Sequence, residues 1–74
     1  MVYNYTGTDA RYTARGGRVE LTDLSEWVDA KFNAGWKRLT VRDTTSEIVG
    51  EIGATVEGYR WWSANERHNA CEVR

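Results

Sequence analysis

Proline is missing from this 74-residue sequence, and cysteine, methionine, histidine and phenylalanine occur once each. A single cysteine, Cys71, excludes a disulfide within the chain. No apolar run approaches the ~20 residues that a membrane-spanning helix needs. A lone thiol and the absence of a secretory signal are typical of proteins in a reducing compartment. We therefore expect a cytoplasmic protein without membrane contact.

The chain also lacks an excess of charge of either sign. Ten basic and eleven acidic residues give a net charge of -1, which argues against a protein that mainly grips nucleic acid. Hydrophobic residues make up 41% of the chain and include four tryptophans, so the composition is that of a folded domain. We predict a single small α+β domain over residues 1–64, followed by a polar C-terminal tail over residues 65–74, which forms a short helix or is frayed.

The first half of the chain predicts a β-hairpin and one helix. Residues 2–6 alternate as an edge strand or an extended arm would, and residues 10–21 predict a hairpin that turns at Gly16-Gly17. In that register one face carries apolar residues and the other carries Arg11, Thr13, Arg15, Arg18 and Glu20. Residues 22–34 have apolar residues at helical spacing, with Asp23 and Glu26 as an N-terminal capping pair.

The second half predicts a three-stranded antiparallel meander over residues 37–43, 47–52 and 59–63. The fold class is therefore α+β: a hairpin, one helix, then the meander, with the helix on one face of the sheet. The expected register turns Leu39, Ile52 and Trp61 toward the helix. It puts Arg42 opposite Glu47, Leu39 opposite Gly50, and Trp61 over Gly50.

Trp61 and Trp62 are adjacent, so on a strand they point to opposite faces. One helix covers only one face, which leaves Trp62 on the other face beside Val49 and Thr40. Tryptophan ringed by arginine is typical of interface anchors. The predicted protein-binding surface consists of Trp62, Val49, Thr40, Arg38, Arg60, Glu51, Arg42 and Glu47.

Three hypotheses for Trp62 remain open at this point. The N-terminal arm, through Tyr3 or Tyr5, or the tail can cover it within the chain. It can also serve self-association as a homodimer, or contact another protein. An alternative function is a small nucleic-acid-binding protein that uses Arg11, Arg15 and Arg18 of the hairpin. The competing interpretation is that these arginines form an ordinary solvated charged face.

Nothing in the sequence predicts an enzyme, a cofactor or a metal site. His68 and Cys71 are three residues apart, but they lack an orienting third group and make only half of a metal site. Asp23, Glu26 and Asp29 suit a solvated helix face with acidic residues near its N-terminus. The glycines are not followed by a phosphate-loop signature. The leading hypothesis is therefore a non-enzymatic protein–protein interaction module.

One resemblance concerns the layout of residues 18–63. The run VELTDLSEWVDAKFNAGWKRLTVRD, followed by EIVGEI and then YRWW, is similar in style to small accessory proteins encoded by phages of actinobacteria. The shared traits are the short length, arginine in preference to lysine, abundant tryptophan and a helix followed by a meander. The resemblance implies a protein made in the cytoplasm of a bacterial host that binds a host protein, and it assigns no functional residue.

Overall fold

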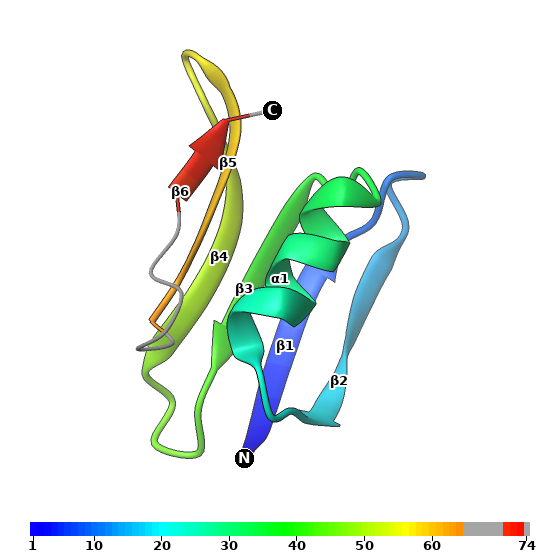
Figure 1. The fold of residues 1–74 in the computed structure, drawn as a ribbon. Coiled ribbons are helices and arrows are strands. Elements are labelled where there is room, and N and C mark those ends of the chain that lie inside the picture. Colours follow the sequence, from blue (N-terminus) through cyan, green and yellow to red (C-terminus); the bar gives the residue numbers. More distant parts are fainter. Residues whose placement is uncertain (65–70, 74) are drawn as a thin grey trace.

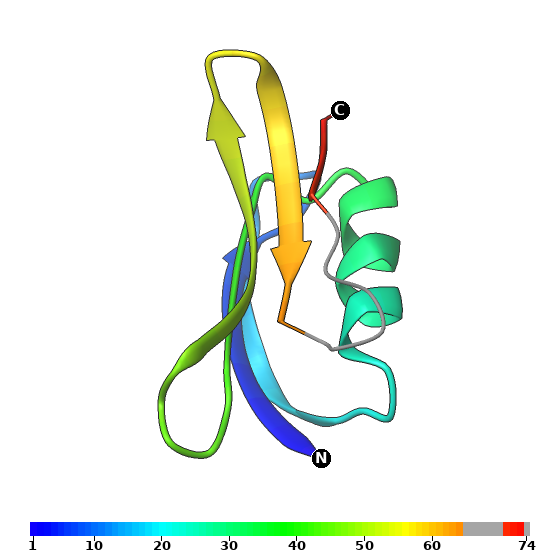
Figure 2. The same cartoon turned by 60° about the vertical axis from the view of Figure 1, so that its left-hand side comes forward.

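The computed structural model describes residues 1–64 and 71–73 and shows one antiparallel sheet with one helix, an α+β fold (Figure 1). The elements in chain order are β1 (Val2–Thr8), β2 (Ala14–Glu20), α1 (Leu24–Asn33), β3 (Arg38–Arg42), β4 (Ile48–Thr55), β5 (Gly58–Ser63) and β6 (Cys71–Val73). The strand order is β2-β1-β3-β4-β5-β6, and every pairing is antiparallel. Helix α1 lies on one side of the sheet and leaves the other side without a helix (Figure 2).

The N-terminal strand is not the edge strand or arm that the sequence predicted. β1 lies inside the sheet, where it pairs with β2 on one side and β3 on the other. The hairpin and the meander are consequently parts of one continuous sheet. Tyr3 and Tyr5 lie on the helix-covered face with Val41, so the prediction that either ring could cover Trp62 is wrong.

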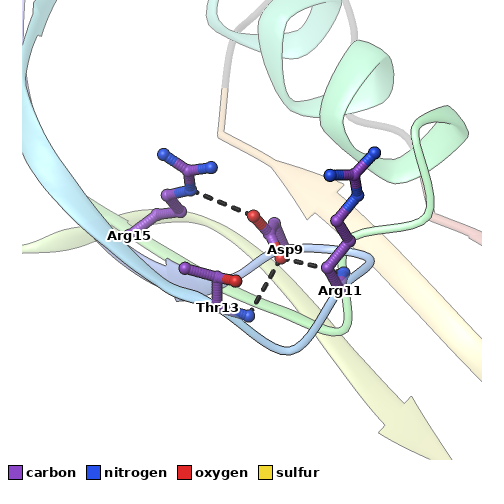
Figure 3. A network of polar contacts seen from close by, with 4 residues as sticks. All are labelled: Asp9, Arg11, Thr13 and Arg15. Carbon is purple, nitrogen blue, oxygen red and sulfur yellow. Dashed lines mark hydrogen bonds and ion pairs between the residues drawn. The ribbon is translucent and has the colours of Figure 1, made fainter.

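The predicted turn at Gly16-Gly17 is also wrong, because the first hairpin turns at residues 9–13 and places both glycines inside β2. The carboxylate of Asp9 organises this turn (Figure 3). Its Oδ1 accepts hydrogen bonds from the backbone N–H groups of Arg11 and Thr13 at 2.9 and 3.0 Å, and its Oδ2 pairs with Arg15 at 3.0 Å. Aspartate favours turns because its side chain bonds to the backbone a few residues on.

Helix α1 lies within the predicted range of residues 22–34 and spans Leu24–Asn33. Asp23 is the N-cap, and its side chain accepts a hydrogen bond from the backbone N–H of Glu26 at 3.1 Å. Gly35 has a φ of +91°, the left-handed conformation that commonly ends a helix and that glycine adopts without strain. Trp36 follows directly and is buried against the core.

The core lies between α1 and the covered face of the sheet. It consists of Tyr3, Leu24, Val28, Phe32, Trp36, Leu39, Val41, Ile52 and Trp61. Gly50 lets the helix approach closely, because a Cβ there would come within 3.3 Å of the Val28 side chain. Trp61 is 3% exposed and packs against Phe32 at a ring-centroid distance of 6.4 Å. The prediction that Trp61 enters the core is confirmed.

The meander has a different register from the predicted one. Leu39 pairs with Ile52, and Ile52 with Trp61, so both pairings are shifted by two residues. Trp61 therefore does not lie opposite Gly50, whose strand partner is Ser63. A shift of two residues leaves each side chain on its predicted face, because the side-chain period of a strand is two.

An irregularity separates the two ends of the β3–β4 pairing. The register shifts between Val41 and Arg42, which is the arrangement of a β-bulge, so that Arg42 pairs with Ile48 instead of the predicted Glu47. Asp43 organises the connecting turn by accepting backbone hydrogen bonds from Thr45 and Glu47 at 2.8 and 3.1 Å.

Part of the predicted tail belongs to the sheet. The backbone of residues 71–73 forms β6 and pairs with β5, with Cys71 at the position opposite Trp62. His68 lies outside the described residues. Within the described part of the chain, helix α1 is not long and apolar enough to cross a membrane.

Candidate functional site

The uncovered face of the sheet is formed by alternate residues of the strands. One row across this face follows the register Gly16–Thr6–Thr40–Glu51–Trp62. Each of these side-chain positions lies on the side opposite to α1, because neighbours along the strands, such as Val41 and Trp61, are buried in the core. Short polar side chains in the middle of the row leave this part of the face flat.

Positive charge gathers on the uncovered face. The register assigns to it Arg18, Arg38, Arg42 and Arg60, together with Glu20 and Glu51. By contrast, α1 on the other side of the sheet carries Glu26 and Asp29 and begins at Asp23. The near-neutral net charge therefore conceals a segregation of charge between the two sides of the molecule.

A hollow of about 620 Å³ lies beside the turn of the first hairpin, where β3 begins. Arg38, Thr40 and Glu51 line it from the uncovered side of the sheet, whereas Tyr59 is on the same side of β5 as Trp61. Its lining includes Tyr12, Lys37, Arg38, Thr40, Glu51 and Tyr59. Gly53 contributes to the depth, because a Cβ at that position would have no other atom within 4 Å. We refer to it below as the sheet hollow.

Lys37 stands between two aromatic rings in the sheet hollow. Its Nζ lies 5.7 Å from the ring centroid of Tyr12 and 5.1 Å from that of Tyr59, distances typical of cation–π contacts. The two rings hold a flexible side chain in place at the wall of the hollow. Arg38 lies next to Lys37 in the chain and is exposed, so two cations border the same space.

Tyr12 is presented to solvent by a strained backbone. Its ring is 73% exposed and its φ is +62°, a conformation that is unfavourable for a bulky residue. The Asp9 network fixes this conformation, since the backbone N–H of Tyr12 also donates to the Asp9 carbonyl at 3.1 Å. Backbone strain of this kind clusters at binding sites.

The predicted binding surface is only partly brought together. Arg38, Thr40 and Glu51 line the sheet hollow, and Trp62 lies next to Glu51. Trp62 is half-buried rather than broadly exposed. Arg60 precedes it on the same face of β5 and pairs with Glu57 at the end of the strand.

Three residues of the predicted protein-binding surface lie away from Trp62 and the sheet hollow. Val49 is not beside Trp62, because the register shift pairs Trp62 with Glu51 and Val49 packs against the core. Glu47 lies exposed in the β3–β4 turn. Arg42 donates to the carbonyl of Ser46 at 2.9 Å in the same turn, away from the sheet hollow.

The arginines of the alternative nucleic-acid site do not share a face. Arg11 lies in the turn, Arg15 is opposite Gly7 on the covered side of β2 and is held by Asp9, and Arg18 is opposite Asn4 on the uncovered side. The trio depended on a turn at Gly16-Gly17, which the structure does not contain.

Sequence reasoning missed Tyr12, Lys37 and Tyr59. Tyr12 comes from the first turn, Lys37 directly precedes β3, and Tyr59 lies in β5. Only the tertiary fold brings these three residues together. The signal that could have indicated Tyr12 is Asp9, whose turn-forming preference competes with that of the two glycines.

The acidic side chains of the described residues do not gather into a metal site. Among residues 1–64 and 71–73, no group of three His, Cys, Asp or Glu side chains is arranged to hold a metal ion.

Asp9 and Asp43 both have pKa values below the ordinary aspartate value. For Asp9 the main cause is the hydrogen bond from the Thr13 backbone, followed by that from Arg15; for Asp43 it is the Thr45 side chain. Both carboxylates stabilise turns.

Comparisons of the chain with protein-family models, with curated proteins and with solved structures found no match.

Proposed function

We propose that this protein is a non-enzymatic protein-binding module whose interaction surface is the sheet hollow with Trp62 at its side. The observation that carries the proposal is the placement of Lys37 between Tyr12 and Tyr59, next to Arg38, in a hollow of about 620 Å³. The positive charge of the two cations suits an acidic side chain of a partner. Arginine and tyrosine are also enriched at protein interfaces.

Trp62 provides an apolar contact at the margin of this surface. It is half-buried, so a partner would cover the remaining surface of the ring while the polar residues of the hollow bind the partner's charge. The resemblance to phage accessory proteins favours a bacterial host protein as that partner, in the host cytoplasm. A second copy of the chain is the other protein partner that the Trp62 surface can take.

Sedimentation velocity over a concentration series distinguishes these two partners. If the chain forms a homodimer through this face, Trp62→Ser converts the dimer to a folded monomer. If the native chain and the variant are both monomers, the surface is left for another protein. A dimer that survives the substitution contradicts a role for Trp62 in self-association.

The acidic-ligand part of the proposal is tested by titrating ¹⁵N-labelled protein with the peptide acetyl-Glu-Tyr-Glu-amide. We expect shifts of the backbone amides around Lys37, Arg38 and Gly53, and a loss of these shifts in Arg38→Gln. Arg18→Gln is the matched control, because it removes the same charge from the same face away from the hollow. Shifts that spread evenly over the arginines, or that survive Arg38→Gln, would contradict the proposal.

A second candidate function is binding of single-stranded nucleic acid on the same face. It is favoured by the four arginines that the register assigns there and by the exposed ring of Tyr12, on which a base can stack. Salt separates the two functions. Binding of oligothymidine should weaken steeply with salt, by a log–log slope of about -0.7 for each phosphate contacted, and Arg18→Gln should reduce that slope. Binding of the acidic peptide should depend on salt far less.

A further inference from the structure

The free edge of β2 presents backbone groups to solvent. Met1 and Leu21 exchange hydrogen bonds in both directions, at 2.8 and 2.9 Å, which defines them as a hydrogen-bonded pair. Such pairs alternate along an antiparallel ladder, so Val19, Gly17 and Arg15 also bond to β1. The residues between them, from Ala14 to Glu20, direct their N–H and C=O groups outward. In the described part of the chain no strand pairs with this edge.

A groove lies between the end of this edge strand and the helix. α1 packs against β4 and β5, and β2 stands away from it (Figure 1). The intervening space has a volume of about 500 Å³. Its lining includes Glu20, Leu21, Asp23, Glu26, Trp27 and Ala30. The floor is therefore apolar and the rim acidic.

The indole of Trp27 is a fixed wall of this groove. Tyr5 meets it edge-on with the ring centroids 5.1 Å apart, and the Nζ of Lys31 lies 5.2 Å from its centroid. Tyr5 itself is held over Gly17, where a Cβ would come within 3.5 Å of the tyrosine ring. A half-buried tryptophan that is fixed by its neighbours binds a ligand without losing further conformational entropy.

The charge of the rim selects the occupant. Asp23 and Glu26 line the groove from the helix, and Glu20 borders it from the end of β2, with its side chain on the uncovered side of the strand. Among the described residues that line the groove there is no lysine or arginine. Lys31 lies over the rings of Trp27 and Trp36, and Arg15 is engaged with Asp9 at the far end of β2. An arginine or lysine side chain matches both features, because its aliphatic stem packs on apolar surface while its charged end reaches the carboxylates.

We propose that β2 and this groove bind an extended basic segment of a partner protein, which adds to the sheet as an antiparallel strand. Strand addition to an exposed edge obtains affinity from main-chain hydrogen bonds and specificity from alternate side chains. The basic side chain of the segment would lie opposite Leu21, on the helix side, and enter the groove over Trp27. This surface is separate from the sheet hollow, so either can fail without the other.

The register of an added strand gives a sharp test. In antiparallel pairing with β2, the partner residues opposite Arg18 and Glu20 exchange backbone hydrogen bonds with the edge and point to the uncovered face. The basic residue, opposite Leu21, points into the groove, and its own N–H points to solvent. We would use the peptide acetyl-Thr-Arg-Thr-Val-Thr-Val-Thr-amide, in which the threonines after the arginine lie opposite Glu20, Arg18 and Gly16, and measure its affinity by calorimetry and by ¹⁵N NMR.

We expect the peptide to shift the amides of Gly16, Arg18 and Glu20 and the indole N–H of Trp27. N-methylation of the peptide's arginine should leave affinity unchanged, whereas N-methylation of the threonines opposite Glu20 and Arg18 should lower it about tenfold or more. Equal binding of the two methylated peptides would overturn strand addition. The absence of binding, or shifts confined to the sheet hollow, would overturn the proposal as a whole.

The acidic rim is tested on the protein. Glu26→Gln should weaken binding of the arginine peptide by roughly threefold, since this carboxylate lines the groove from the helix and is exposed. Glu47→Gln is the matched control, because it removes an exposed carboxylate from the β3–β4 turn. A peptide with norleucine in place of arginine should bind all forms alike. A loss that is as large in Glu47→Gln, or a β2-mediated dimer of the free protein in sedimentation, would contradict the assignment to a basic partner segment.

Discussion

The covered face and the uncovered face of the sheet are made by the same strands but from different residues. On β3 and β5, residues such as Leu39, Val41 and Trp61 are at most 3% exposed, while Arg38, Arg60 and Trp62 alternate with them on the other side. The covered face holds the fold together through apolar burial. No second helix among the described residues buries the uncovered face, so its arginines and its half-buried tryptophan border solvent and can make contacts outside the chain.

The adjacent tryptophans test this comparison most directly. Trp61→Ala should lower the free energy of unfolding by about 3–5 kcal/mol, because it leaves a cavity in the core beside Phe32. Trp62→Ala should cost only about 1 kcal/mol, since its ring is half-buried and borders solvent. Urea denaturation followed by circular dichroism measures both. If Trp61→Ala does not fold, Trp61→Leu keeps the comparison; equal losses would mean that the two faces stabilise the fold alike.

Alanine substitutions at two glycines of β4 compare the packing of the two faces without removing any side chain. Gly50→Ala should destabilise by about 1–3 kcal/mol, because its Cβ would crowd the Val28 side chain at 3.3 Å and push the helix away. Gly53→Ala meets nothing within 4 Å and should change stability by less than about 0.5 kcal/mol. The same denaturation experiment applies. A cost at Gly53 as large as that at Gly50 would show that the uncovered face is also closely packed.

The two faces could be predicted because of a physical property of strands. The predicted pairing of β4 with β5 was shifted by two residues, and a shift by two leaves every side chain on the same side. Hence Trp61, Ile52 and Leu39 were assigned to the core correctly although their partners were not. The helix was predictable for a local reason, since its cap at Asp23 and its stop at Gly35 lie within the sequence of the element itself.

The rest could not be predicted, because it depends on contacts between distant segments. The sheet hollow joins Tyr12, Lys37 and Tyr59 only after β1 has paired with β3, which no local pattern indicates. The first turn was misplaced because two adjacent glycines resemble a hairpin turn, whereas three hydrogen bonds to the Asp9 side chain fix the chain earlier. Gly17 lies instead beside the ring of Tyr5, where a Cβ would be in ordinary contact with the ring at 3.5 Å.

The two lysines give a smaller test, which compares the helix with the sheet hollow. Lys31 lies 5.2 Å from the ring centroids of both Trp27 and Trp36 on the helix side, and Lys37 lies between two tyrosines. Tryptophan is the stronger cation–π partner, and Lys31 also suits the last turn of the helix. Lys31→Gln should therefore cost about 1 kcal/mol and Lys37→Gln about half of that.

Arginine at either position is the control for the lysine substitutions, because it retains the cation over the rings. Thermal unfolding of the four variants checks the order. A larger loss for Lys37→Gln than for Lys31→Gln would mean that the sheet hollow contributes to folding and not chiefly to binding.

The smallest expected effect concerns the turn that supports Tyr12 beside the sheet hollow. The pKa of Asp9 is lowered in the folded protein, first by the Thr13 backbone N–H and then by Arg15, so the folded state favours the ionised carboxylate. The resulting stabilisation is present above the ordinary aspartate pKa and is lost as pH falls through the lowered pKa. Asp9→Asn should thus reduce stability at neutral pH and remove part of the acid dependence of the stability.

Asp43→Asn is the comparison, because the pKa of Asp43 is lowered in a turn away from Tyr12. NMR titration of the carboxyl carbons checks the direction of both pKa shifts, while the Lys37 and Tyr59 resonances report on the hollow. If these resonances respond to Asp43→Asn as strongly as to Asp9→Asn, the first turn does not position the residues that line the sheet hollow.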